Sequence, residues 1–230
     1  MSSGLAIVGY GKMGRLIEQL APEYGFEVRA RFDIDNISAL SANSLAGNAA
    51  AVEFSTPEAA PENLRRLAAA GMNTVCGTTG WFDQLPAVKE SVAAANTGLV
   101  WSPNFSVGVN VFLQTVAHAA AFFAKYPEYD AWGWEIHHST KKDALSGTLK
   151  KLAEEMRNRG YTREITLTAN RAGAHPGTHE IGFDSAVDTI TLRHTARSRE
   201  GFAHGALQAA RWVADKKGFF EFKEILGELG

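Results

Sequence analysis

The stretch from Glu135 to Thr148 contains the densest group of reactive side chains in the sequence. His137 and His138 are neighbours, and Lys141 follows shortly after them. Successive side chains on a strand point to opposite faces, so at most one of the histidines faces a given pocket, and Glu135 shares the face of His137. A histidine can transfer a proton near neutral pH, and a lysine cation strengthens carboxylate binding. The stretch therefore predicts proton transfer beside an anionic ligand.

A predicted helix begins at Ser146 and runs to about Arg159. In its first turn, Ser146 offers an N-cap hydroxyl and Thr148 a second hydroxyl, and Gly147 lets a ligand approach the backbone closely. The free backbone N–H groups of a helix N-terminus bind anions. Two interpretations stay open here, namely an anion site and an ordinary capped helix with Lys141 as surface charge.

Metal ligation by the histidines is not predicted. His137 and His138 point to opposite faces of a strand. His175 and His179 are four residues apart, but a proline and a glycine between them prevent the helix on which such a pair normally binds a metal.

A second motif lies near the N-terminus, where Gly9, Gly11 and Gly14 form a G-x-G-x-x-G turn. The turn follows an apolar strand, residues 5–8, and precedes apolar residues at helical spacing. The first glycine permits a tight turn, the second lets a diphosphate approach the backbone, and the third lets helix and strand pack closely. In this context the motif predicts dinucleotide binding.

The acid expected to bind the ribose of the dinucleotide is Asp33, with Asp35 as the alternative. Asp33 lies 19 positions after Gly14, near the spacing of about 20 that this role requires. An acid at this position favours NAD, whereas Lys12 and Arg31 flank it and could hold a 2′-phosphate. The sequence therefore predicts NADH or NADPH as the cofactor and does not choose between them.

Two further loops follow predicted strands. Gly77-Thr78-Thr79-Gly80 comes after a strand that ends at Cys76, and Ser55-Thr56-Pro57 comes after the strand before it. Ligands of doubly wound sheets bind at the carboxyl ends of the strands. Each loop alone is typical of a helix cap, but together the two loops predict a cofactor cleft.

Strands and helices alternate over about the first hundred residues, which predicts an α/β fold with a doubly wound parallel sheet. After Pro103 the pattern favours an α+β domain with an open, mixed sheet. The first part is expected to hold strands at 5–8, 27–32, 51–54, 72–76 and 99–101 and helices at 58–70 and 83–96. The second part is expected to hold helices at 106–125 and 146–159 and strands at 132–138, 165–170, 178–183 and 189–196, followed by a helix at 201–215 and an amphipathic tail at 219–229.

The composition argues against several classes of partner. The chain has 230 residues, a formal charge of −2 and a single cysteine, Cys76. Interspersed charges near neutrality give no basic surface for nucleic acid or anionic lipid. One cysteine forms no internal disulfide, and no basic leader or run of about 18 apolar residues is apparent. We expect a soluble cytoplasmic protein with no membrane or nucleic-acid partner.

Taken in order, the motifs resemble those of one family, the dihydrodipicolinate reductases (4-hydroxy-tetrahydrodipicolinate reductases) of bacterial lysine and diaminopimelate biosynthesis. The resemblance covers nearly the whole chain, but Leu145 stands where the family commonly has proline, and Ser139-Thr140 where it has a basic or histidine-rich pair. The blocks that carry the resemblance are V-G-Y-G-K-M-G-R (8–15), E-F-S-T-P-E (53–58), G-T-T-G (77–80), S-P-N-F-S-V-G-V-N (102–110), E-I-H-H-x-x-K-x-D-A-x-S-G-T (135–148), R-A-G-x-x-x-G-x-H (171–179) and S-R-x-x-F-A-x-G-A (198–206).

The resemblance implies NAD(P)H-dependent reduction of a cyclic dicarboxylate, 4-hydroxy-tetrahydrodipicolinate, to tetrahydrodipicolinate with loss of water. It also implies a Rossmann-like cofactor domain, residues 1–103 rejoined by 200–230, and a substrate-binding and oligomerisation domain, residues 104–199, that assembles a homotetramer through its sheet. The alternatives are a related amino-acid or imine dehydrogenase, which would lack the histidine and lysine block, and a non-catalytic NAD(H) sensor, which would not need the anion turn.

The resemblance also implies roles for individual residues. His137 matches the proton donor, Lys141 the lysine that assists it, and His138 a histidine that contacts substrate. The carboxylate-binding turn would be Ser146, Gly147 and Thr148. The residues expected to hold the cofactor, from the glycine turn, the strand-end loops and the family's nicotinamide contacts, are Gly9, Gly11, Lys12, Met13, Gly14, Asp33, Phe54, Ser55, Gly77, Thr78, Thr79, Asn104 and Phe105.

Overall fold

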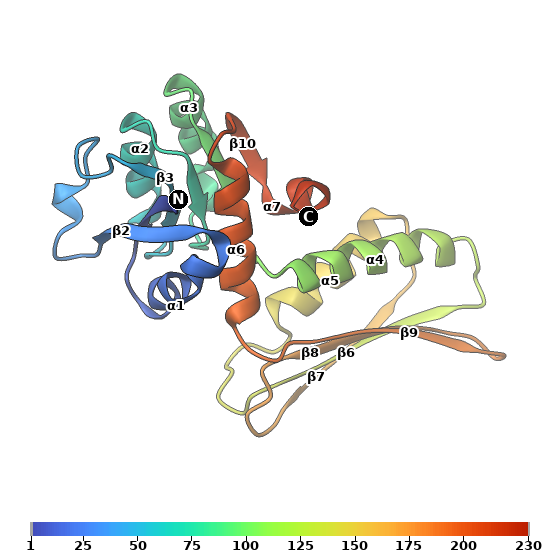
Figure 1. The fold of residues 1–230 in the computed structure, drawn as a ribbon. Coiled ribbons are helices and arrows are strands. Elements are labelled where there is room, and N and C mark those ends of the chain that lie inside the picture. Colours follow the sequence, from blue (N-terminus) through green and yellow to red (C-terminus); the bar gives the residue numbers. More distant parts are fainter. Residues whose placement is uncertain (1, 230) are drawn as a thin grey trace. The chain divides into compact units, whose positions relative to one another are not determined.

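The computed structural model of the protein describes residues 2–229. The described residues form two compact units (Figure 1), one of residues 2–107 together with residues 200–229 and one of residues 108–199. The sequence boundary expected after residue 103 thus lies four residues before the structural one. No helix among residues 2–229 is long and apolar enough to cross a membrane.

The first unit is built on a six-stranded parallel sheet of order β10-β5-β4-β3-β1-β2. Its inner strands are short apolar runs with little alternation in burial, because helices cover both faces of the sheet. The strands are β1 (Ser3–Val8), β2 (Phe26–Phe32), β3 (Asn48–Glu53), β4 (Thr74–Cys76), β5 (Gly98–Trp101) and β10 (Gly218–Glu221). The α-helices are α1 (Lys12–Leu20), α2 (Ala60–Ala69), α3 (Leu85–Ala94), α6 (Glu200–Val213) and α7 (Phe222–Ile225).

Helices α1 and α6 pack together on one face of this sheet, and α2 and α3 pack together on the other. Buried alanines such as Ala206 and Ala210 let α6 lie close to the strands, against Val52 and Val75. The helix at 200–213 therefore completes the core of the N-terminal sheet although almost one hundred residues separate the two parts of the unit along the chain.

The expectation of an amphipathic tail at 219–229 has to be corrected, because it did not foresee a strand there. Residues 218–221 instead form an edge strand, β10, in register with β5 from Gly218 opposite Gly98 to Glu221 opposite Trp101. Only the short helix α7 and a single further turn, Leu226–Glu228, follow it. These residues add a strand to the sheet because β5 offers unpaired backbone groups at its edge.

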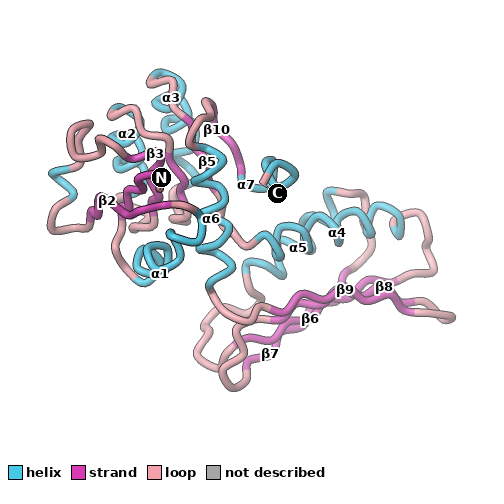
Figure 2. The backbone as a smooth tube through the Cα atoms, in the orientation of Figure 1, coloured by secondary structure: helices cyan, strands magenta, loops and turns pink. Residues whose placement is uncertain are grey.

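The second unit has a four-stranded mixed sheet of order β7-β6-β8-β9, in which β6 and β7 are parallel and the other pairs antiparallel. Its helices α4 and α5 lie over one face of the sheet (Figure 2), and β6 accordingly alternates between buried and half-buried positions. The predicted fold class, a Rossmann-like sheet plus an open mixed sheet, is confirmed. The elements are α4 (Val107–Phe123), β6 (Asp130–His137), α5 (Gly147–Asn158), β7 (Ile165–Arg171), β8 (Thr178–Asp184) and β9 (Thr189–Thr195).

Close packing of α6 leads to a first prediction. A Cβ atom at Gly205 would lie 1.8 Å from the backbone oxygen of Phe105, whereas one at Gly201 would meet no atom nearer than 3.6 Å. Gly205→Ala is expected to lower the free energy of unfolding by about 2 kcal/mol or more, because backbone must move to admit the methyl group. Urea unfolding followed by circular dichroism measures the change.

Gly201→Ala is the matched control, since it adds the same methyl group to the same helix with only ordinary van der Waals contacts. Alanine is favoured over glycine in helices, so this variant should be as stable as the parent or slightly more so. Equal stability of the two variants would show that α6 does not need the close approach at Gly205.

Candidate active site

A buried polar cluster lies on the helix-covered face of the second sheet. Glu135 and His137 share that face of β6, as the alternation predicts, and they are 0% and 9% exposed. His179 lies directly across from Glu135 on β8 and is 5% exposed. Ile181 and Phe183, further along the same face of β8, are fully buried. The polar cluster therefore continues the hydrophobic core of the unit at one end of the sheet.

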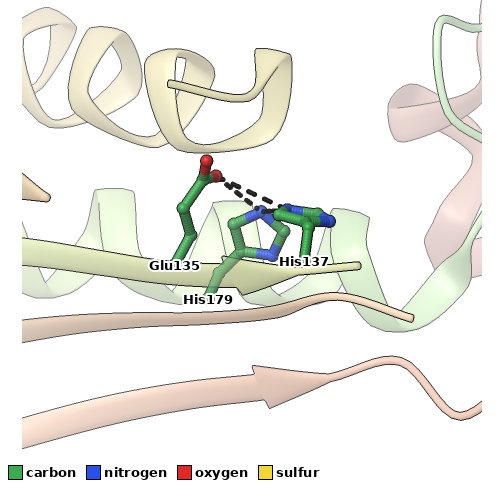
Figure 3. Close-up of side chains that lie close together, drawn as sticks. All are labelled: Glu135, His137 and His179. Atoms are coloured by element: carbon green, nitrogen blue, oxygen red, sulfur yellow. Dashed lines mark hydrogen bonds and ion pairs between the residues drawn. The ribbon is translucent and has the colours of Figure 1, made fainter. Parts of the chain in front are cut away.

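The three side chains point at one another (Figure 3). Glu135 Oε2 lies 3.5 Å from His137 Nε2 and 3.4 Å from His179 Nε2. The two Nε2 atoms are 3.3 Å apart, and the rings meet edge to face. We call Glu135, His137 and His179 the histidine cluster. Protons can be shared among its members at these distances.

The carboxylate of Glu135 is satisfied from two other elements. Its Oε1 accepts the Ser146 backbone N–H at 2.9 Å and Arg171 Nη2 at 2.8 Å, and the Ser146 hydroxyl donates to Oε2. Burial alone raises the pKa of the Glu135 carboxyl, but these hydrogen bonds outweigh it and hold the pKa below its usual range. The cluster is therefore anchored on a charged carboxylate.

Burial lowers the pKa of both histidines of the cluster, because it disfavours the charged ring. For His137 the Glu135 carboxylate opposes this effect, whereas Lys141 and Arg171 add to it. His179 is the more strongly affected, and burial together with the neighbouring His137 lowers its pKa to about 4. His179 is thus a neutral ring at ordinary pH.

The predicted anion turn is only partly available. The Ser146 hydroxyl and N–H both serve Glu135, and the same hydroxyl accepts the N–H of Leu149 at 3.2 Å as the N-cap of α5. Gly147 is exposed with open space around it, and Thr148 is half-buried. Among residues 2–229, no group accepts the backbone N–H of Gly147 or Thr148. These two N–H groups are the part of the turn that could bind a ligand.

Two further predicted residues stand apart from the histidine cluster. His138 directly follows the end of β6, and its Nδ1 atom lies 2.8 Å from the Thr140 hydroxyl. Lys141 is paired with Asp143 at 2.7 Å, and it acts on His137 through its charge. The charge of Lys141 therefore acts on the cluster, whereas its ammonium group is paired with Asp143 and not with a member of the cluster.

The histidine cluster also has the donors of a metal site, one carboxylate oxygen and two imidazole nitrogens within 4.8 Å of one another. However, Arg171 already forms an ion pair with the same carboxylate, and the charge of Lys141 also reaches the cluster. A divalent cation would be repelled by both side chains. We therefore interpret the cluster as a site that binds protons and not a metal ion.

In the first unit, the glycine turn fits a dinucleotide diphosphate. Gly9 has φ +90°, and a Cβ there would lie 2.3 Å from the Phe54 oxygen, while one at Gly14 would lie 2.4 Å from the Gly9 oxygen. Helix α1 begins after Gly11 with no side-chain cap and no acid in its first turn, and the space beside Gly11 is open. Met13 packs its side chain towards the core. The helix N-terminus is thus left for an anion.

The residues expected around the ribose differ in their exposure and in whether they are already paired. Asp33 is exposed directly after β2 and accepts the backbone N–H of Ile34 at 3.0 Å. Arg31 is tied to Glu18, with Nε at 3.0 Å from Oε1, and Glu18 also accepts the Tyr10 hydroxyl. Lys12 is exposed beside the turn. Arg31 is therefore already paired, so Lys12 is the better placed of these two cations for a 2′-phosphate.

The loops after β3, β4 and β5 hold the other residues expected at the cofactor. The Ser55 hydroxyl donates to buried Glu53, and Phe54 lies over Gly77, where a Cβ would be 2.0 Å from its ring. The Thr78 hydroxyl is buried without a hydrogen-bond partner among residues 2–229. Thr79 is exposed, and the Asn104 side chain caps the N–H of Ser106 at 2.8 Å.

Phe105 departs from its expected position. Its ring is 2% exposed and packs against Phe222 at a centroid distance of 4.8 Å, within the core of the first unit. Because the Phe105 ring is packed in the core, it is not available for direct contact with a nicotinamide. The sequence did not distinguish the two roles because an aromatic residue after a strand suits either.

Sequence reasoning missed His179 and Arg171 as members of the site. Both belong to the R-A-G-x-x-x-G-x-H block, and that block was the available signal. Their meeting with Glu135 depends on the pairing of β6 with both β7 and β8. Such pairings between distant segments cannot be derived from spacing along the chain.

A parallel sheet with a glycine turn, together with a mixed sheet that carries a buried cluster of one carboxylate and two histidines, is typical of a two-domain, dinucleotide-dependent oxidoreductase. Residues 4–105 match the family description "Dihydrodipicolinate reductase, N-terminus", and residues 108–226 match "Dihydrodipicolinate reductase, C-terminus". The chain therefore belongs to the dihydrodipicolinate reductase family, as its motifs indicated. Members of this family use NAD(P)H, and the N-terminal unit is the nucleotide-binding domain.

Individual relatives agree with this assignment. The 4-hydroxy-tetrahydrodipicolinate reductase of Christiangramia forsetii is 34% identical over 98% of both chains. The enzyme of the same name from Archaeoglobus fulgidus is 34% identical over 94% of this chain and 96% of its own. A solved structure, dipicolinate-bound dihydrodipicolinate reductase from Paenisporosarcina, superposes with a TM-score of 0.84 at 22% identity and covers 98% of this chain and all of its own.

The low pKa of His179 leads to a prediction about stability. The unfolded chain takes up a proton near the ordinary pKa of 6.5, whereas the folded chain does so only near pH 4. The contribution of His179 to the free energy of unfolding is therefore fully present above about pH 7. It is lost as pH falls, by about 2 kcal/mol between about pH 7 and about pH 5. Urea unfolding at several pH values measures the loss.

His179→Gln removes the titrating group and should show a smaller loss of stability over the same pH range. His118→Gln, which changes an exposed histidine on α4, is the control and should keep the parent's pH dependence. An equal pH dependence in all three proteins would mean that His179 titrates normally in the folded state.

Proposed function

We propose that this protein reduces 4-hydroxy-tetrahydrodipicolinate to tetrahydrodipicolinate in lysine and diaminopimelate biosynthesis, with His137 as its proton donor. Family membership across both units supports the reaction. The observation that carries the assignment of residues is the histidine cluster, which holds His137 against a buried carboxylate in the unit that matches the family's C-terminal half. A nucleotide sensor would have no use for such a cluster.

The substrate is a dicarboxylate, and the second unit offers groups that suit it. The N–H groups of Gly147 and Thr148 open the N-terminus of α5, and Lys141 supplies a nearby positive charge. The related Paenisporosarcina reductase binds dipicolinate, a planar dicarboxylate. We assign one substrate carboxylate to the start of α5. His138, which follows β6 and contacts Thr140, is not needed for this assignment.

The nicotinamide cofactor, when bound, would supply a hydride to the substrate ring after its hydroxyl group and a neighbouring hydrogen have left as water, at the carbon that carried the hydroxyl. The adjacent carbon then carries enamine character and needs a proton. His137 gives that proton, and Lys141 orients the substrate and favours its anionic form. Gly9, Gly11 and the uncapped start of α1 hold the diphosphate of the cofactor, and Asp33 accepts a hydrogen bond from its ribose.

We further propose a cytoplasmic homotetramer that forms through the uncovered face of the second sheet. Trp132, Trp134 and Ile136 alternate along this face of β6 and are only half-buried in a single chain. Burying them against a second copy would remove apolar surface from water.

The proton donor can be tested by substitution. His137→Gln and Lys141→Ala are each expected to lower turnover by about 10²-fold, the usual scale for a lost proton-transfer group. The assay follows oxidation of NADH or NADPH with freshly generated substrate. His118→Gln should leave turnover unchanged, because this exposed histidine lies on α4 away from the cluster.

Two results would contradict these assignments at different levels. Parent protein that oxidises neither cofactor above background would refute the proposed reaction. Parent protein that turns over normally, with less than about a threefold effect in both variants, would leave the reaction standing and remove His137 and Lys141 from its chemistry.

The choice of cofactor should depend on Asp33. Its carboxylate accepts the ribose hydroxyl of NADH and repels the 2′-phosphate of NADPH, while Arg31 is already paired with Glu18. Asp33→Ala is expected to raise the ratio of kcat/KM for NADPH over NADH about tenfold, with Lys12 as the remaining cation. Initial rates with each cofactor measure the ratio.

Asp35→Ala is the matched comparison, since Asp35 is the other exposed acid of the same loop. If this variant and not Asp33→Ala changes the ratio, the ribose acid has been assigned to the wrong residue.

A further inference from the structure

The histidine cluster contains one residue, His179, that the proposed reaction does not use. His179 comes from β8 and meets Glu135 and His137 only through its Nε2 atom. The same atom lies 3.2 Å from the Ser146 hydroxyl. Its other nitrogen, Nδ1, is buried and has no hydrogen-bond partner among residues 2–229.

The unpartnered Nδ1 atom decides where the proton of His179 lies. A buried N–H without an acceptor is costly, so the neutral ring carries its proton on Nε2, next to the Glu135 carboxylate. The Nε2–H of His179 then lies beside Glu135 Oε2, at 3.4 Å between the heavy atoms, and beside the Ser146 hydroxyl. This donor joins Arg171 and Ser146 around the same carboxylate.

His137 is oriented by the same contacts. Its Nε2 atom faces Glu135, so its Nδ1 atom is the nitrogen left to face a substrate. Gly177 keeps side chains away from that side of the ring, because a Cβ there would lie 3.0 Å from Cε1 and 3.1 Å from Nδ1. Gly177 also has φ +139°, a conformation that other residues rarely adopt.

The charges around His137 come from several elements. Arg171 from β7 and Lys141 from the loop after β6 both disfavour its protonated form. Glu135 favours the protonated form, and so to a lesser degree does Asp143, which is paired with Lys141. The remaining titratable neighbour, His194 on β9, lies across from His179 and stacks on Phe112 of α4. Glu135 is thus the anion that keeps His137 able to bind a proton.

We propose that His179 and Glu135 are positioning residues for the proton donor, in which His179 Nε2–H and His137 Nε2–H both donate to Glu135, so that His137 Nδ1 exchanges the proton with substrate. The inference rests on the proposed function and assigns the reacting nitrogen within it. It also gives the buried carboxylate a role in the reaction.

The proton transfer balances within His137 and the substrate. The protonated ring breaks its Nδ1–H bond and keeps the electron pair on Nδ1. The proton forms the new C–H bond on the substrate carbon next to the one that accepted the hydride. The neutral ring retains its Nε2–H, still donated to Glu135, and His179 stays neutral throughout.

Nitrogen-15 NMR of the imidazole rings tests the proton positions directly and needs no turnover. In the parent protein, His179 should be neutral with its proton on Nε2 around neutral pH, and neutral His137 should also carry its proton on Nε2. A proton on Nδ1 of either ring would overturn the proposal even if the proposed reaction is correct. The same spectra stay informative if the parent turns out not to reduce the substrate.

Substitutions test the consequence for turnover. Glu135→Gln keeps the shape of the side chain and removes its charge, so kcat near neutral pH should fall about tenfold or more. The alkaline limb of the kcat profile should move to lower pH, because His137 then loses its proton more readily. Glu164→Gln changes an exposed acid of the same unit and should leave both the rate and the profile unchanged. An unmoved alkaline limb in Glu135→Gln would reject the positioning role.

His179→Gln and His179→Leu form a second matched pair. Glutamine can place an N–H near the position of Nε2, so it should keep kcat within about threefold, whereas leucine should lower it about tenfold. Equal rates for the two variants would show that the donor is not needed. Loss of parent activity after removal of metals by a chelator, restored by a divalent cation, would instead assign the histidine cluster to a metal and overturn the inference.

Discussion

The carboxylate of Glu135 is fully buried, and much of the second unit is arranged so that this charge remains stable. A buried charge without partners is destabilising by several kcal/mol, so each of its donors must be held in place. Arg171 comes from the end of β7, and the N–H and hydroxyl of Ser146 come from the start of α5. One side chain therefore fixes a parallel neighbour strand, a helix terminus and the orientation of two imidazole rings. The proposed proton chemistry depends on how this charge is compensated.

Local rules were sufficient for the parts of the site that depend on neighbours along the chain. The glycine turn at 9–14 and the shared face of Glu135 and His137 follow from backbone geometry and from the alternation of a strand. Ser146 was correctly expected at the start of a helix, but its hydroxyl serves Glu135 and not a ligand. The membership of His179 depends on the register of β6 with β8, which brings together residues 44 positions apart. Residue spacing carries no information about that register.

The first unit shows the same division between local pattern and distant pairing. Buried apolar runs predicted the parallel strands, because a strand covered on both faces has no polar side. The edge strand β10 was missed because its role depends on the free edge of β5, more than one hundred residues earlier in the chain. Likewise, Arg31 resembled a phosphate ligand in the sequence, whereas its pairing with Glu18 is visible only when β2 and α1 lie together.

Pairing of charges also explains how a protein of net charge −2 can bind a dianion. The two cations that act on His137 are each matched by an acid, Lys141 by Asp143 and Arg171 by Glu135, so the charges of these four side chains cancel. Burial and these cations lower the pKa of His137. A dicarboxylate bound at the start of α5 would add negative charge nearby and raise that pKa again. Binding of the substrate and protonation of His137 would then reinforce each other, because the ligand that needs the proton also stabilises the ring that carries it.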